Sequence, residues 1–124
     1  MAKYLFILNG PAYGSEHSYN GLRLAGNVSH HGGIVSRSVE NEVRIFLIGD
    51  AATCGKKGQT VPQGFYNIEN MIHSILRHLG QVGVCASCMD ARGITDAELI
   101  EGCHRSSMDE LTIWTDWADK VLVF

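Results

Sequence analysis

The chain has 124 residues, of which 45% are hydrophobic and 19% are charged, and its formal net charge at pH 7 is −3. These values are ordinary for one globular domain, predicted to cover residues 1–124, and they exclude intrinsic disorder. The longest basic run is Lys56-Lys57 and every apolar run has the length of a strand, so we expect neither nucleic acid nor a membrane as a partner.

Strands and helices alternate in the first half of the predicted fold. Lys3–Leu8 is apolar throughout, as expected of a strand that is buried on both faces, and Glu42–Ile48 is the next strand. Between them, residues 16–31 have an apolar helical face, and Ser15 is placed to cap that helix. Gly49–Phe65 has the composition of a long, glycine-bearing loop, a kind of segment that is usually functional or mobile.

The clearest helical pattern in the chain follows Asn67, a predicted N-cap, and stops at Gly80. Apolar residues of this segment recur at the spacing of one helical face. They are Ile68, Met71, Ile72, Ile75, Leu76 and Leu79. The apolar residues Val82–Cys85 then form the third predicted strand.

The rest of the chain holds short elements. Capping boxes that begin at Thr95 and Ser107 open two helices, the second of which runs through Trp117. Residues 102–105 and Lys120–Phe124 are the last two strands. Strands that alternate with helices predict right-handed βαβ units. We therefore expect an α/β fold, a three-layer α/β/α sandwich with about five mostly parallel strands.

The segment most informative about function carries the motif Cys85-x-x-Cys88, followed by Arg92. If its strand is interior, Cys85 reaches the carboxyl edge of the sheet, where α/β folds place their ligands and chemistry. A thiol there, with Arg92 to supply positive charge, is a candidate reactive thiolate. Because the next helix cap is Thr95, the pair is predicted to lie in a loop, unlike the pair of thioredoxins, which opens a helix. The alternative is that both thiols are small apolar residues at a strand end.

Other kinds of site have weaker support. Residues 49–57 resemble a phosphate-binding loop, but five residues instead of four separate the two glycines, and Lys57 stands where a hydroxyl should bind Mg²⁺. The cysteine motif is half of a zinc site, and no second pair completes it. We therefore expect no cofactor and no metal. Cys103 is assigned to the core, and Cys54 has no assigned role.

Six segments, in order over nearly the whole chain, carry a resemblance to a known family. They are Asn9–Glu16, Leu22–Ala25, Arg44–Ala51, Tyr66–Glu69, Cys85–Ile94 and Trp114–Phe124. Together they resemble the DsrE/DsrF-like family, and within it the YchN-like branch. This resemblance implies a flavodoxin-like sandwich that assembles into homotrimers or homohexamers.

The resemblance also implies a chemistry. TusD-type sulfur-relay subunits of this family hold sulfur as a persulfide on a cysteine eight residues before the glycine of an Arg-Gly turn, and Cys85 and Gly93 have this spacing. Cys88 matches the YchN-like branch but not the relay subunits. The implied function is that of an intracellular sulfur carrier or sulfurtransferase-like protein, served by sulfur donor and acceptor proteins.

Cys85, Cys88 and Arg92 are accordingly the predicted catalytic residues. Cys88 is predicted to resolve a persulfide on Cys85 by forming a disulfide, unless it points into the core. Three further residues are expected to line the pocket if their strand neighbours that of Cys85: Asn9, Tyr13 and Glu16. Two alternatives stay open: an oligomeric binding or assembly module with structural cysteines, and a Cys85/Cys88 dithiol–disulfide redox protein. No secretory signal pattern opens the sequence, so we expect a cytoplasmic protein.

Overall fold

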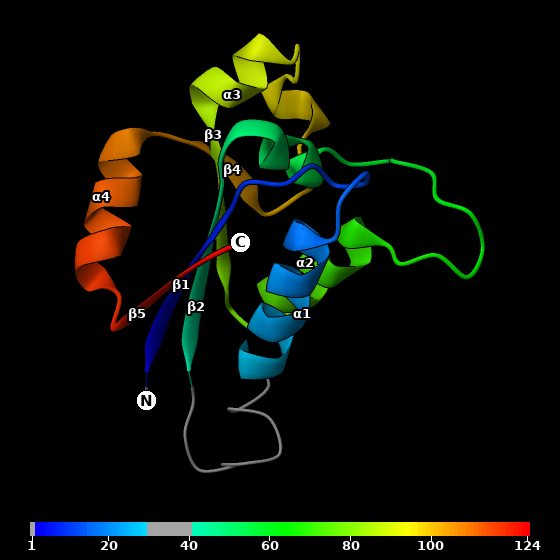
Figure 1. The fold of residues 1–124 in the computed structure, drawn as a ribbon. Coiled ribbons are helices and arrows are strands. Elements are labelled where there is room, and N and C mark those ends of the chain that lie inside the picture. Colours follow the sequence, from blue (N-terminus) through cyan, green and yellow to red (C-terminus); the bar gives the residue numbers. More distant parts are fainter. Residues whose placement is uncertain (1, 30–40) are drawn as a thin grey trace.

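The computed structural model describes residues 2–29 and 41–124, and within them a five-stranded parallel sheet has helices on both faces (Figure 1). This confirms the predicted α/β fold. The predicted end of the first helix, at His31, lies outside the described residues. The elements in chain order are β1 (Lys3–Leu8), α1 (His17–Ser29), β2 (Glu42–Leu47), the 3₁₀-helix η1 (Gly49–Gly55), α2 (Ile68–Arg77), β3 (Gln81–Cys85), α3 (Ala86–Ala91), the 3₁₀-helix η2 (Asp96–Glu98), β4 (Cys103–Ser106), α4 (Met108–Trp117) and β5 (Lys120–Val123).

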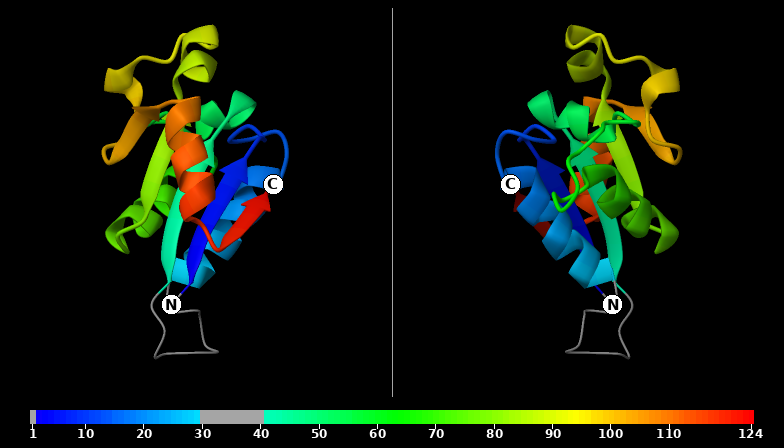
Figure 2. Two further views of the ribbon diagram at one scale, coloured as in Figure 1. Left: turned by 90° about the vertical axis from the view of Figure 1, so that its left-hand side faces the viewer. Right: turned by 90° about the vertical axis from the view of Figure 1, so that its right-hand side faces the viewer.

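The strand order is β4-β3-β2-β1-β5, so β3 lies inside the sheet. Helices α1 and α2 cover one face, α4 covers the other, and α3 lies beyond the carboxyl ends of the strands (Figures 1 and 2). The interior position of β3 brings Cys85 to the carboxyl edge of the sheet, as predicted. None of the described helices, the longest of which has 13 residues, has the length and apolarity needed to cross a bilayer.

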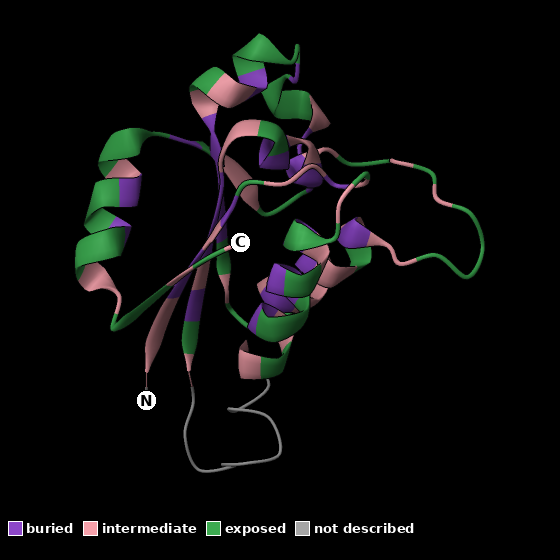
Figure 3. Cartoon of the chain, in the orientation of Figure 1, coloured by how far each residue is buried: buried purple, intermediate pink, exposed green. Residues whose placement is uncertain are grey.

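Each face of the sheet has its own apolar core, because successive strand residues point to opposite faces. Phe6 and Val84 belong to the larger core, under α1 and α2. Leu5 and Cys85 belong to the smaller core, under α4. Figure 3 shows the buried residues along the strands and along the helix sides that face them. The Cys85 side chain therefore lies on the α4 side of the sheet.

The segment after β2 is only in part the loop that the sequence predicts, because residues 49–55 form the 3₁₀-helix η1 and residues 56–65 contain no helix or strand. Its small residues Ala51, Ala52, Cys54 and Gly55 are buried. A Cβ atom on Gly55 would lie 2.9 Å from the Val84 side chain, so only glycine lets this turn pack so closely on β3. The first part of the segment is therefore packed against the carboxyl ends of the strands.

Three predicted helix caps are confirmed and one is wrong. The side chains of Asn67 and Ser107 each accept a hydrogen bond from the backbone N–H three residues further on, and Thr95 forms its capping box. The second predicted box does not close, because the Glu110 carboxylate accepts hydrogen bonds from side chains of β4 instead. The hydroxyl of Ser15 is buried and has no hydrogen-bond partner among the described residues, so it caps nothing there.

Helix α2 ends before the predicted stop at Gly80. Leu79 adopts the left-handed conformation, with φ of 65°, and its side chain is 91% exposed. It therefore does not extend the apolar face of α2. Glycine is needed next to it for a different reason, since a Cβ atom on Gly80 would lie 2.5 Å from the Ile75 side chain.

Replacing Leu79 with glycine is expected to raise the free energy of unfolding by about 1 kcal/mol, because a left-handed conformation is unfavourable for every residue with a Cβ atom. Chemical denaturation measures the change. The matched control is Leu24→Gly, at an exposed leucine within α1, which should lower the free energy of unfolding by a similar amount. Destabilisation by Leu79→Gly would contradict this interpretation.

Candidate functional site

The two cysteines of the motif lie at the start of a helix. Cys85 ends β3 and is the N-cap of α3, and Cys88 lies in the first turn of that helix. The prediction that the pair lies in a loop is therefore wrong. Helix α3 has six residues and a cysteine in place of the usual oxygen-bearing cap, so it has neither an apolar period nor a capping signal. The pair therefore opens a helix, as the pair of thioredoxins does.

The environment of Cys85 favours its thiolate. The side chain is 7% exposed, and its Sγ lies 3.4 Å from the Ser87 hydroxyl. Burial raises the pKa of Cys85, but hydrogen bonds from the Cys88 thiol, the Ser87 hydroxyl and the backbone N–H groups of both residues outweigh it. The pKa therefore lies below its ordinary value of 9.0. A thiol of this kind is a candidate nucleophile.

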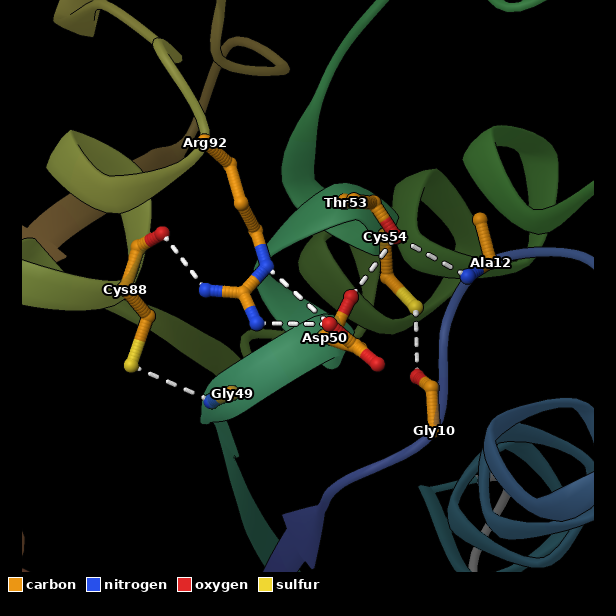
Figure 4. Close-up of polar contacts among 8 residues, drawn as sticks. All are labelled: Gly10, Ala12, Gly49, Asp50, Thr53, Cys54, Cys88 and Arg92. Atoms are coloured by element: carbon orange, nitrogen blue, oxygen red, sulfur yellow. Dashed lines mark hydrogen bonds and ion pairs between the residues drawn. The ribbon is translucent and has the colours of Figure 1, made fainter.

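Cys88 is half-buried, and its sulfur contacts polar groups. The backbone N–H of Gly49 donates a hydrogen bond to its Sγ at 3.1 Å (Figure 4). Burial and the hydrogen bond to Cys85 raise the pKa of Cys88, and the Gly49 N–H acts in the opposite direction. In the reduced protein, Cys88 therefore keeps its proton and shares it with the sulfur of Cys85.

The guanidinium group of Arg92 faces Asp50, not the thiols. Its Nε and Nη2 donate to Oδ1 of Asp50 at 3.2 and 2.5 Å, and its Nη1 donates to the carbonyl oxygen of Cys88 at 3.0 Å (Figure 4). No hydrogen bond within the described residues joins it to either sulfur. The hydrogen bonds that lower the pKa of Cys85 come from Ser87 and Cys88 instead, and Arg92 fastens α3 to η1.

A second arginine fastens the other side of α3. Arg105 on β4 donates to Asp90 of α3 at 2.7 Å and lies 3.4 Å from Asp96. The short helix that follows Cys85 and contains Cys88 is thus held by ion pairs to two neighbouring elements. These ion pairs attach the C-terminal end of α3, at Asp90 and Arg92, to β4 and η1.

The three predicted pocket residues make their contacts elsewhere. Asn9 donates to the carbonyl oxygen of Phe124 at 3.2 Å, and the Tyr13 hydroxyl accepts a hydrogen bond from the N–H of Ile68 at 3.1 Å. The Glu16 side chain is exposed. Strand β2 separates β1 from β3, so the condition attached to this prediction, that the two strands are neighbours, is not met.

The other two cysteines have environments that disfavour a thiolate. Burial raises the pKa of Cys54 to about 12, and its Sγ lies 3.7 Å from the carbonyl oxygen of Gly10 (Figure 4). Burial also raises the pKa of Cys103 to about 12, and this residue packs against the larger core. In the described ranges, no group of three or more His, Cys, Asp and Glu side chains is placed to hold a metal ion.

Sequence reasoning missed two contributors to the site, Gly49 and Asp50. Both follow β2 directly, and β2 pairs with β3 in parallel. The carboxyl ends of adjacent parallel strands meet at the same edge of a sheet, which is why this dipeptide reaches Cys88 and Arg92. The sequence shows that Gly49 and Asp50 directly follow a strand. That they lie beside Cys88 and Arg92 could be inferred only once the strand order was known.

The chain is similar to known proteins over nearly its whole length. The family model described as DsrE/DsrF-like matches residues 2–124. Protein YchN of Escherichia coli K12 is 40% identical over an alignment of 126 positions, which covers both chains completely. An uncharacterized protein of Methanopyrus kandleri, MK0008, is 32% identical over 119 residues, which are 95% of this chain and 90% of that protein.

Solved structures agree with these sequence matches. The crystal structure of the ychN protein from E. coli has a TM-score of 0.85 at 35% sequence identity and covers both chains completely. A protein of unknown function from Methanobacterium thermoautotrophicum has a TM-score of 0.65 at 14% identity, over 98% of this chain and 99% of that one, and shares the fold.

Proposed function

Because the chain belongs to the DsrE/DsrF-like family, we propose that it is a sulfur carrier that holds sulfane sulfur as a persulfide on Cys85. The observation that carries the proposal is the environment of this thiol. It stands at the carboxyl end of an interior strand, and hydrogen bonds hold its pKa below 9.0 although the side chain is almost buried. Thiolate character and access are the two requirements for attack on a sulfur atom.

The loading step is an exchange without net oxidation. The Cys85 thiolate attacks the outer sulfur of a donor persulfide, R–S–SH. A bond forms between Cys85 Sγ and that sulfur, the S–S bond of the donor breaks, and its electron pair leaves with the donor as the thiolate R–S⁻. An acceptor thiolate later attacks the same outer sulfur, and Cys85 leaves as a thiolate, which its low pKa favours.

Sulfur loading is expected in the wild-type protein and in Cys88→Ala, and is expected to be absent in Cys85→Ser. The protein is mixed with a cysteine desulfurase and cysteine without added reductant and is alkylated after a short time. Its mass is then measured by mass spectrometry of the intact protein. A gain of one sulfur atom marks the persulfide. Cys103→Ser is the control and should load like the wild type, because the removed thiol has a pKa of about 12. Equal loading of Cys85→Ser would refute the proposal.

One observation favours a second candidate, dithiol–disulfide exchange. Cys88 lies in the first helical turn after the N-cap Cys85, and the interaction of the two thiols lowers the pKa of Cys85 and raises the pKa of Cys88. In this reaction Cys85 attacks a substrate disulfide, Cys88 attacks the resulting mixed disulfide, and the substrate leaves as a dithiol. The two candidates differ in their need for Cys88. Reduction of a disulfide substrate requires both cysteines, whereas loading of sulfur requires Cys85 alone.

Assembly into a homotrimer or homohexamer and residence in the cytoplasm remain part of this proposal. Val121 and Val123 on β5 support the assembly, because they are 41% and 63% exposed. They pair with Leu5 and Ile7 of β1, so they extend an apolar surface on the α4 side of the sheet. An exposed apolar edge strand is a surface that another protein chain covers favourably.

A further inference from the structure

Cys88 is the chemical group at the site that the loading step does not use. Its sulfur accepts a hydrogen bond from the N–H of Gly49 at 3.1 Å, and its interaction with Cys85 lowers the pKa of Cys85 and raises the pKa of Cys88. Cys85 is the N-cap of α3 and Cys88 is the third residue of its first turn, the position whose backbone N–H faces the N-cap side chain in a capping box, and a disulfide needs about 3.5–4.5 Å between the Cβ atoms. A Cys85–Cys88 disulfide therefore requires only a small local movement.

We propose that Cys88 resolves the persulfide of Cys85, so that the protein itself releases the carried sulfur as sulfide. This inference rests on the proposed function. The Cys88 thiolate attacks Cys85 Sγ, which is the inner sulfur of the persulfide. A bond forms between the two cysteine sulfurs, the bond from Cys85 Sγ to the outer sulfur breaks, and the outer sulfur leaves with the electron pair as HS⁻.

The electrons of this step balance within the site. The sulfane sulfur gains two electrons and becomes sulfide, and the two cysteine thiols lose two and become a disulfide. A dithiol reductant, the co-reactant of the cycle, then restores both thiols by thiol–disulfide exchange. The dithiol is therefore the source of both electrons and leaves as a disulfide, the sulfane sulfur is the final electron acceptor, and the protein returns to the state described above.

The contacts of Cys88 explain why this residue would attack only after Cys85 has taken up sulfur. Before loading, burial keeps Cys88 protonated, and the hydrogen bond to Cys85 and the negative charge on that sulfur act in the same direction. Loading moves the negative charge to the outer sulfur, away from Cys88. The hydrogen bond from Gly49, which favours the Cys88 thiolate, does not depend on Cys85 and stays in place.

The rest of the site would keep the attacking sulfur in position during this step. Arg92 donates to the carbonyl oxygen of Cys88 at 3.0 Å while its other nitrogens bind Asp50 on η1. Gly49, which donates to the sulfur, belongs to the same 3₁₀-helix. The backbone and the sulfur of Cys88 are thus both attached to η1.

The test is a single turnover with a small persulfide, glutathione persulfide, added in equal amount to the reduced protein without other thiols. Sulfide is measured over time. The protein is analysed by mass spectrometry of the intact chain and by peptide mapping. The wild type is expected to release one equivalent of sulfide and to form a Cys85–Cys88 disulfide. Cys88→Ala and Cys88→Ser are expected to keep the persulfide and to release sulfide at least about tenfold more slowly, because they lose an intramolecular nucleophile.

The matched control is Cys103→Ser, which removes another half-buried thiol and should behave like the wild type. Circular dichroism verifies that each variant is folded. Equal rates of sulfide release from loaded wild type and loaded Cys88 variants would overturn this inference and leave the sulfur-carrier proposal standing. Absence of loading in the wild type and in both Cys88 variants would overturn both.

Discussion

Alkylation of the native protein with iodoacetamide at neutral pH is expected to modify Cys85 at least about 30 times faster than Cys54. The pKa of Cys85 lies below 9.0 and the pKa of Cys54 lies at about 12, a difference of at least three units in the pKa values. The higher intrinsic nucleophilicity of the more basic thiolate offsets about half of this difference on a logarithmic scale. The remaining factor is about 30, and the deeper burial of Cys54 increases it.

The pH dependence of this reaction identifies its cause. Because the folded pKa of Cys85 is lowered, its alkylation rate should stay high as the pH falls below 9.0 and decline only through the folded pKa. Cys88→Ala removes a hydrogen bond to the thiolate and should move the midpoint to higher pH. Mass spectrometry of trypsin-digested protein follows each site separately. A midpoint at or above 9.0 in the wild type would contradict the described environment of Cys85.

Replacement of Trp114 with alanine is expected to lower the free energy of unfolding by about 3–5 kcal/mol, a large part of the stability of a domain this size. Trp114 is 3% exposed and belongs to the smaller core under α4. Its ring packs edge-on against the Phe46 ring, with 6.4 Å between the two ring centroids. It also packs over Gly83, at which a Cβ atom would lie 3.2 Å from the ring. Few other side chains are available to fill the cavity.

The matched control is Trp117→Ala on the same helix. Trp117 is half-buried, and the guanidinium group of Arg44 lies 3.8 Å from the centre of its ring. Trp117→Ala should lower the free energy of unfolding by about 1 kcal/mol, the magnitude of a partly exposed cation–π contact. Urea unfolding of both variants measures the difference. Similar losses for the two variants would show that the core under α4 contributes less than its burial indicates.

The strands could be predicted from the sequence because a parallel sheet covered on both faces requires continuous apolar runs. The predicted strands 3–8 and 42–48 agree with β1 and β2 to within one residue. The helix pattern after Asn67 was equally readable up to its last turn. There, the backbone of Leu79 leaves the helical conformation, which apolar spacing alone does not reveal.

The candidate site was predictable only in part. The position of Cys85 followed from the strand that precedes it. The helix that contains Cys88 could not be predicted. A helix of six residues is too short to show a helical period of apolar residues, and this one has no capping side chain. The partner of Arg92 was also hidden, since Asp50 is 42 residues away and is brought near only by the pairing of β2 with β3.

The attachment of α3 has a consequence for the conditions under which its thiols react. Its two ion pairs, Arg92 with Asp50 and Arg105 with Asp90, have side chains that are 31–64% exposed, and ion pairs between exposed side chains weaken as the salt concentration rises. Rising ionic strength should therefore make local opening of this helix more frequent, while the apolar cores keep the sheet closed. Each opening breaks the hydrogen bonds that stabilise the Cys85 thiolate. We therefore expect the reactivity of this thiol to change with the salinity of its surroundings.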